Sequence, residues 1–212
     1  MQAAVFSFDT GSEGWTGADN NASSPFGSGG IPLIVDHHGS GGNPGGYISI
    51  TDPSDLDFYF AAPASVLGDQ SAAYGTSLTW DLKVSGNTYD PVPDAVLSGA
   101  GMELVIDVGP APPSNVWTHY SIALSEGGGW RKGQLNGPVP TAAEFQAVLA
   151  NLDGFRLRGE YFAGGVGSEV GSLDNVGFAV VPEPAEWLSA AGLMCALGGI
   201  LWRSRTPGRH NS

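Results

Sequence analysis

Residues able to act as nucleophile, base or zinc ligand are few, and their spacing does not match hydrolase motifs. Ser28 and Ser40 stand between glycines, but no Gly-x-Ser-x-Gly elbow joins a strand to a helix. His119 lies in an alternating, strand-like segment with no carboxylate beside it in the sequence. The histidines and the single Cys195 lack the spacing of a zinc site. We therefore expect neither serine-hydrolase nor zinc chemistry.

The Asp-His-His triplet at residues 36–38 follows the apolar segment Ile31–Val35 and resembles the manganese-binding signature of DHH-type phosphoesterases. That chemistry needs further aspartates from an upstream strand, which hold two metal ions about 3.5–4 Å apart. Only Asp9 and Asp19 precede the triplet, and neither follows the pattern. The glycine-rich segment after the triplet favours an exposed surface loop instead.

Charge is distributed unevenly along the 212 residues. Residues 1–181 carry nineteen acidic and five basic side chains, a net charge of −14, whereas residues 182–212 carry two acidic side chains and three arginines. Such an acidic body repels phosphate backbones, so we expect no nucleic-acid partner. Because Cys195 lies in the tail, the body contains no disulfide and must be stabilised by its core.

Alternating apolar residues predict a protein built mainly of β-strands. In Leu78–Val84 the apolar residues all fall on one face, which indicates a half-buried antiparallel strand. Clusters of Gly, Pro, Asn and Asp between such segments predict turns. The expected strands are Val5–Phe8, Ile31–Val35, Tyr47–Thr51, Phe58–Ala61, Leu78–Val84, Met102–Val108, Trp117–Leu124, Phe155–Tyr161 and Leu173–Val180.

One short helix interrupts the strands. Thr141 and Glu144 have the spacing of a capping box, and an apolar stripe from Phe145 to Leu152 follows. About nine strands and one helix in a single domain predict an all-β fold, a jelly-roll β-sandwich.

The body is similar to the laminin B (laminin IV type A) domain, a galactose-binding-like jelly roll. The resemblance covers residues 5–178 and rests on the order of its segments. They are Gly14-Trp15, Phe58–Pro63, Leu67–Asp69, Ser71–Gly75, Leu78–Leu82, Trp117-Thr118, Trp130-Arg131, Leu149–Leu152, Phe155–Tyr161 and Leu173–Val176. The resemblance implies an extracellular, non-catalytic module.

Jelly rolls of this class often hold a structural calcium ion between the last strand and the loop that follows the first strand. Calcium prefers hard oxygen ligands such as carboxylates. Asp9, Glu13, Asp19 and Asp174 would be the ligands if those strands pair. The alternative is that Asp174 and the asparagine after it only form a turn.

A saccharide site is the second kind of site we consider, because sugars stack on exposed aromatic rings. Trp130 follows three glycines and precedes Arg131, so we expect these two residues to be exposed and to contact a ligand. Trp80 alternates with leucines and is expected in the core. For Trp15 and Trp117 burial is also the favoured interpretation.

The last thirty residues predict a membrane segment. The apolar stretch Trp187–Trp202 would rise about 24 Å as a helix, slightly short of the roughly 30 Å hydrocarbon core. Arg203 and Arg205 after it would stay in the cytoplasm and leave the body outside. Pro182, Glu183 and Pro184 before it complete a pattern that resembles the PEP-CTERM sorting signal. A buried core helix is the alternative.

The PEP-CTERM resemblance implies export, anchoring in membrane lipid and processing by an exosortase. No basic and apolar leader follows Met1, so we expect that a signal peptide precedes this sequence and that Ala3 and Ala4 lie near the mature N-terminus. The alternative is a cytoplasmic body, against which the arginines argue.

The expected units are a β-sandwich (1–180), a linker (181–186) and a transmembrane helix with a basic tail (187–212). The sequence thus predicts an exported protein, anchored at the inner membrane and then surface-bound or released, without catalytic activity, in an extracellular polysaccharide matrix. The alternative is a carbohydrate-binding module with a specific glycan.

Overall fold

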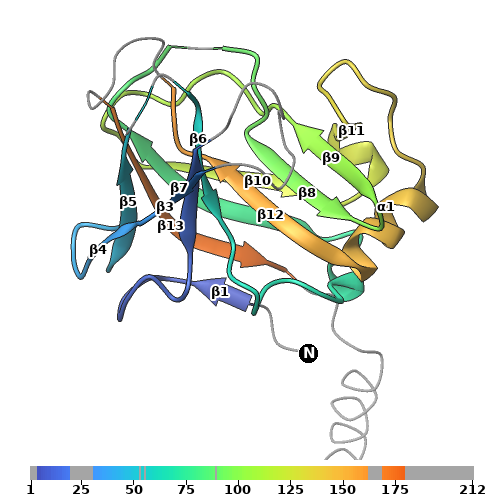
Figure 1. Cartoon of the computed structure of the whole chain (residues 1–212), viewed down its shortest axis with the longest axis horizontal. Helices are drawn as coiled ribbons and strands as arrows, with labels where there is room; N and C mark the ends of the chain where they lie inside the picture. The colour runs from blue at the N-terminus through green and yellow to red at the C-terminus, as the bar shows by residue number, and fades with distance from the viewer. Residues whose placement is uncertain are drawn as a thin grey trace, which may run out of the picture. The chain divides into compact units, whose positions relative to one another are not determined.

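The computed structural model describes residues 4–19, 31–52, 54, 56–88, 90–161 and 169–179, which form a sandwich of two β-sheets (Figure 1). The first sheet contains β1 (Ala4–Phe6), β4 (Asp36–His38), β5 (Tyr47–Thr51), β7 (Ser77–Val84), β10 (Thr118–Ala123) and β13 (Val170–Phe178). The second contains β2 (Thr16–Asp19), β3 (Ile31–Leu33), β6 (Phe58–Ala61), β8 (Ala95–Gly99), β9 (Met102–Ile106), β11 (Arg131–Lys132) and β12 (Leu152–Arg158). The all-β jelly-roll prediction is confirmed.

Strand β13 is the centre of the first sheet, whose order is β10-β7-β13-β5-β4. One edge of β13 pairs with β7. Along the other edge, its N-terminal part pairs with β5 and its C-terminal part with β1. A β-bulge between Asp174 and Gly177 interrupts the ladder with β7, and Asn175 there adopts a left-handed conformation with φ of 50°. The first and last strands, β1 and β13, are therefore paired, which was the condition stated for the calcium site.

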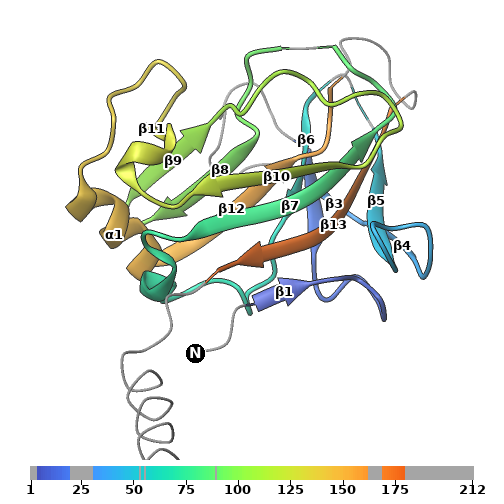
Figure 2. The same ribbon diagram turned by 180° about the vertical axis from the view of Figure 1, so that it is seen from behind.

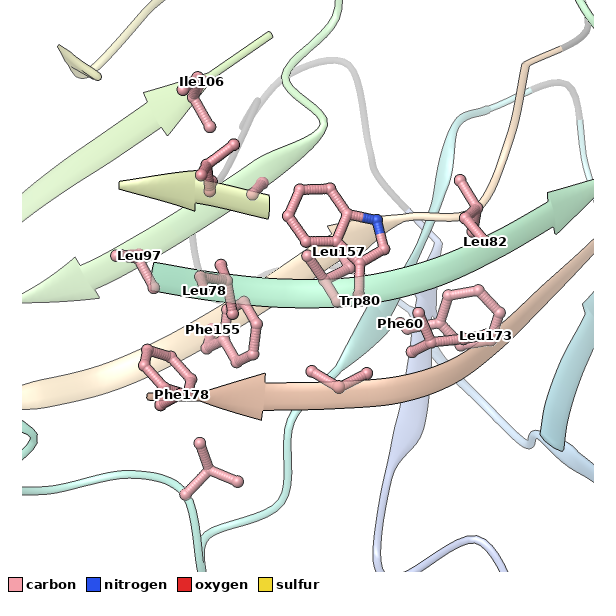
Figure 3. Packing of buried hydrophobic residues seen from close by; sticks show 14 of the residues in the cluster. Phe60, Leu78, Trp80, Leu82, Leu97, Ile106, Phe155, Leu157, Leu173 and Phe178 are labelled. Carbon is pink, nitrogen blue, oxygen red and sulfur yellow. The ribbon is translucent and has the colours of Figure 1, made fainter. Parts of the chain in front are cut away.

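The core lies between the two sheets. Figure 3 shows Leu78, Trp80 and Leu82 of β7 facing Phe155 and Leu157 of β12. All five are buried, and this burial is the main stabilising contribution to such a fold. The alternation predicted for β7 is confirmed, because its even-numbered residues point into the core.

The helix α1 (Ala142–Ala150) begins as predicted, with Thr141 and Glu144 forming a reciprocal capping box. Its Phe145 ring packs edge-on against Trp130, with 5.8 Å between ring centroids. Two short 3₁₀ turns, η1 (Ser71–Ala73) and η2 (Glu126–Gly128), complete the described elements.

Four strands were missed, the two-residue β11 and three others that each contain a weak local signal. Strand β2 has the sequence Thr-Gly-Ala-Asp and is a strand because it is hydrogen-bonded between β3 and β6. Strand β8 directly follows a proline-rich turn, and β4 is the Asp-His-His triplet. The loop predicted for that triplet is wrong, since β4 pairs with β5 at the edge of the first sheet.

Candidate functional site: an aromatic and polar sheet face

The outer face of the first sheet carries the polar residues of its alternating strands. In Figure 2 strands β10, β7 and β13 face the viewer, and no helix lies across them. On β7 the outward residues are Thr79, Asp81 and Lys83, because their neighbours point into the core. The strand register places His119 of β10 and Asp174 of β13 directly opposite Asp81.

Asp81 is the centre of a hydrogen-bond cluster on this face. Its Oδ1 lies 2.6 Å from Nδ1 of His119, and its Oδ2 accepts from the side-chain amides of Asn43 at 3.2 Å and Asn175 at 2.8 Å. Because a carboxylate can only accept, Nδ1 of His119 carries the proton and Nε2 is turned away from Asp81. The Asp81 side chain is only 5% exposed, so protein donors satisfy it before any ligand arrives.

The segment of residues 39–46 is fastened over this cluster by carboxylates. Asp174 is fully buried and accepts from the Asn43 amide at 2.6 Å, and Asp9 accepts from the Gly46 amide at 3.0 Å. The Gly46 amide lowers the pKa of Asp9, whereas burial raises the pKa of Asp174 to about 6. A Cβ on Gly46 would stand 2.1 Å from the carbonyl oxygen of Phe8, so only glycine allows this approach.

Three rings and one ammonium group lie beside the cluster. His38 stacks on Tyr47 with 4.4 Å between ring centroids, and Trp117 meets Tyr47 edge-on at 5.6 Å. Nζ of Lys83 lies 4.8 Å from the Tyr47 centroid and 4.6 Å from the Trp117 centroid, which is cation–π geometry. We call His38, Tyr47, Lys83, Trp117 and His119 the aromatic face.

Trp117 is half-buried on this outer face and its Nε1 donates to the carbonyl of Gly41 at 3.1 Å. The burial predicted for Trp117 is therefore wrong, whereas that of Trp15 and Trp80 is confirmed. Lys83 was not predicted as a site residue, and no carboxylate near His119 was expected from its sequence neighbours. The alternation of β7 placed Lys83 on the outer face, but only the strand register reveals that Asp81 faces His119.

The predicted exposure of Trp130 is also wrong, because its side chain is fully buried. The turn η2 ends at Gly129 in a left-handed conformation with φ of 96°, and this fold directs the indole back into the core. There its Nε1 donates to the carbonyl of Ala123 at 2.9 Å. Arg131 follows half-buried in β11, away from the aromatic face in the other sheet.

The histidines of β4 make structural contacts. Nε2 of His37 lies 2.8 Å from the carbonyl oxygen of Phe8, and Nε2 of His38 lies 2.9 Å from Oγ of Ser49. Among the described residues, no group of three or more His, Cys, Asp or Glu side chains is arranged to hold a metal ion.

The four carboxylates suggested for calcium do not fit one site. Asp9, Glu13 and Asp174 accept backbone amides of Gly46, Phe8 and Asn43, respectively. Asp19 lies in the second sheet and accepts from the Ser54 hydroxyl at 3.1 Å. These oxygens are engaged by protein donors, so calcium stays a prediction without a defined site.

A concavity lies on the outer face of the second sheet. It has a volume of about 350 Å3, and its lining includes Ser98, Glu103, Asp153 and Arg156. Its charged groups are two carboxylates around one guanidinium, and no aromatic ring contributes to it. It therefore lacks the ring surface that saccharides stack on.

The motif residues Pro182, Glu183, Pro184, Arg203 and Arg205 lie outside the described residues. Within the described ranges, no helix has the length and apolar character needed to cross a bilayer.

Together, the sheets and this surface define a jelly-roll β-sandwich module. The chain belongs to the Laminin B (Domain IV) family, which it matches over residues 59–188. Laminin subunit gamma-1 of Homo sapiens is 31% identical over 162 residues, which cover 72% of this chain and 9% of that protein. The chain thus corresponds to a small part of this relative's length.

Solved structures share the fold. The L4b domain of human laminin alpha-2 aligns with a TM-score of 0.64 at 14% identity, over 85% of this chain and 98% of that domain. The solution structure of CtCBM11 aligns with a TM-score of 0.50 at 14% identity, over 85% of this chain and 96% of that one. The predicted resemblance to laminin B is confirmed.

Replacing Trp130 tests its role in the core. We expect Trp130→Ala to lower the free energy of unfolding by about 3–5 kcal/mol, because a fully buried indole leaves a cavity. Denaturant unfolding measures this, with Val139→Ala at a surface that is 49% exposed as control. An effect no larger than that of the control would contradict the burial of Trp130.

A buried acidic group should make stability depend on pH. Glu160 is 6% exposed, and burial, followed by the nearby Asp52 and Asp57, raises its pKa to about 8 from an ordinary value of 4.5. The folded state then holds a proton that the unfolded chain releases. Stability from Glu160 is present below the ordinary pKa and is lost as pH rises through about 8.

We expect Glu160→Gln to remove this dependence and to stabilise the protein above pH 8. Between the two pKa values the wild-type free energy of unfolding should fall by up to about 1.4 kcal/mol per pH unit from this group. Denaturant unfolding from pH 4 to 9 measures it, with the exposed Asp153→Asn as control. Equal pH profiles for wild type and Glu160→Gln would refute the assignment.

Proposed function

We propose that this protein is an exported, non-catalytic module of an extracellular polysaccharide matrix and that it binds saccharide through the aromatic face. The observation that carries the proposal is the half-exposed Trp117 ring beside Tyr47 and Lys83 on a sheet face that no described helix covers. Rings of this kind supply apolar contact to sugar C–H groups, and neighbouring polar groups supply hydrogen bonds.

The surroundings of these rings support a binding role. Trp117 is fixed by its hydrogen bond to Gly41, and the segment that contains Gly41 is in turn fastened by Asp174 and Asp9. A ring fixed before binding loses little conformational freedom when a ligand arrives. The aromatic face is therefore preorganised rather than assembled by the ligand.

The same face argues for binding rather than hydrolysis. The His119–Asp81 pair has the geometry of a general base and its orienting carboxylate. Among the described residues, however, no side-chain hydroxyl or thiol is hydrogen-bonded to Nε2 of His119, so the pair has no side-chain nucleophile to activate. Membership in the Laminin B family supports an extracellular, non-catalytic module as well.

The C-terminal segment is the basis for the proposed cellular location of the protein. The Pro182-Glu183-Pro184 motif, the apolar stretch Trp187–Trp202 and the arginines after it support sorting through an exosortase, with temporary anchoring in the inner membrane. The sandwich would then lie on the outer side, where polysaccharide is available.

The saccharide proposal is tested by electrophoresis of the full chain through gels that contain single soluble polysaccharides, both neutral and uronate-bearing. We expect at least one polymer to retard the protein, and Trp117→Ala to weaken that binding by about 2- to 10-fold, as for one lost ring contact. Val116→Ala, at a neighbouring position that is 51% exposed, is the control. Free migration of the wild type in every gel would exclude the proposal.

The sorting proposal is tested by fusing residues 181–212 to an exported reporter. We expect the fusion in the membrane fraction, and a variant with Leu193→Glu and Leu197→Glu in the soluble fraction, because a charge at mid-membrane costs about 2.5–3.5 kcal/mol. A wild-type fusion that is entirely soluble would show that the tail is no membrane segment.

A further inference from the structure

We infer that the aromatic face selects acidic saccharides, chains that bear uronate carboxylates, and that the Lys83 ammonium contacts the carboxylate. This inference rests on the proposed function, because it names the ligand class for the same face. The basis of the inference is that some charged groups of this face already have hydrogen-bond or ion-pair partners in the protein, whereas Lys83 has no ion-pair partner among the described residues.

The central carboxylates of this face are satisfied internally. Asp81 accepts from His119, Asn43 and Asn175, and its side chain is 5% exposed. Asp174 is fully buried and accepts the backbone amides of Asn43 and Asn175. Both groups are engaged by protein donors, so neither is free to accept hydrogen bonds from an arriving ligand. Two exposed acids lie near the face in the described part of the chain: Asp36, two residues before His38 on the edge strand β4, and Asp9, which accepts from the Gly46 amide.

The ammonium group of Lys83, in contrast, remains available. Lys83 has no carboxylate within ion-pair distance in the described part of the chain, whereas Lys132 is paired with Glu144 and Arg158 with Asp57. The Nε2 edge of His119, whose side chain is 60% exposed, faces away from Asp81. A ligand at this face therefore meets the positive charge of Lys83 and, at Nε2 of His119, a hydrogen-bond acceptor.

The position of Lys83 is also defined before binding. Its Nζ lies within 4.8 Å of two ring centroids, and both rings are fixed by further contacts, Tyr47 by His38 and Trp117 by Gly41. Holding an ammonium group over rings rather than against a carboxylate leaves its charge uncompensated. Such a group is suited to pair with a carboxylate that the ligand brings.

The net charge of −14 on residues 1–181 does not prevent this selection. At physiological salt the Debye length is about 8 Å, so distant acidic groups are screened and the nearest charges decide. The contact between Lys83 and a uronate should consequently weaken as salt increases, and binding to a neutral chain should not.

The experiment compares polygalacturonate with its carboxyl-reduced form, which has the same backbone without charge. We expect the full-length wild type to bind the acidic polymer about tenfold more tightly, a difference of one ion pair. Lys83→Gln, which keeps most of the aliphatic stem, should lose this preference, so that it binds the two polymers with equal strength. Lys83→Arg should retain the preference, and Lys132→Gln, whose lysine already has a partner, should change nothing.

The outcomes separate the two proposals. Wild-type binding to both polymers with equal strength, or a preference that survives in Lys83→Gln, would overturn the acidic selection and leave the saccharide site in place. Binding to neither polymer, nor to any polysaccharide of the wider panel, would overturn the proposed function itself. Circular dichroism of each variant establishes that the sandwich is folded.

Discussion

The aromatic face depends on one buried carboxylate, Asp174. It lies in the central strand of the first sheet, at a β-bulge, and its oxygens accept backbone amides instead of water. A buried acid of this kind is tolerated only where such donors reach it. Asn43 is one of those donors, so the carboxylate determines where the segment of residues 39–46 crosses the sheet, and that segment then supplies the carbonyl that fixes Trp117.

The fold was largely predictable, because its strongest elements can be recognised from residues that are close in the sequence. The alternation of Leu78–Val84 and the capping box at Thr141 each need only neighbouring residues to be recognised, and both are as expected. Strand β2 was not predictable in this way, since Thr-Gly-Ala-Asp has little β propensity and forms a strand through its neighbours on both sides.

The site was less predictable, because it is defined by pairs that are far apart in the sequence. His119 and Asp81 meet only through the register of β10 and β7. The predictions for the two tryptophans were wrong for a related reason. The neighbouring residues suggested an exposed position for Trp130 and a core position for Trp117, but the backbone geometry places Trp130 in the core and Trp117 on the outer face. A left-handed glycine turns Trp130 inward, and Trp117 precedes β10 on the outward side of the alternation.

The pairing of the first and last strands also governs how the module carries force. Ala4 lies opposite Phe178, so the chain enters and leaves the sandwich at adjacent positions. Tension between these two points would part β1 from β13 one pair after another, rather than shear a whole ladder at once. Because its two ends are adjacent, such a module adds little to the distance between the segments that precede and follow it in a polypeptide.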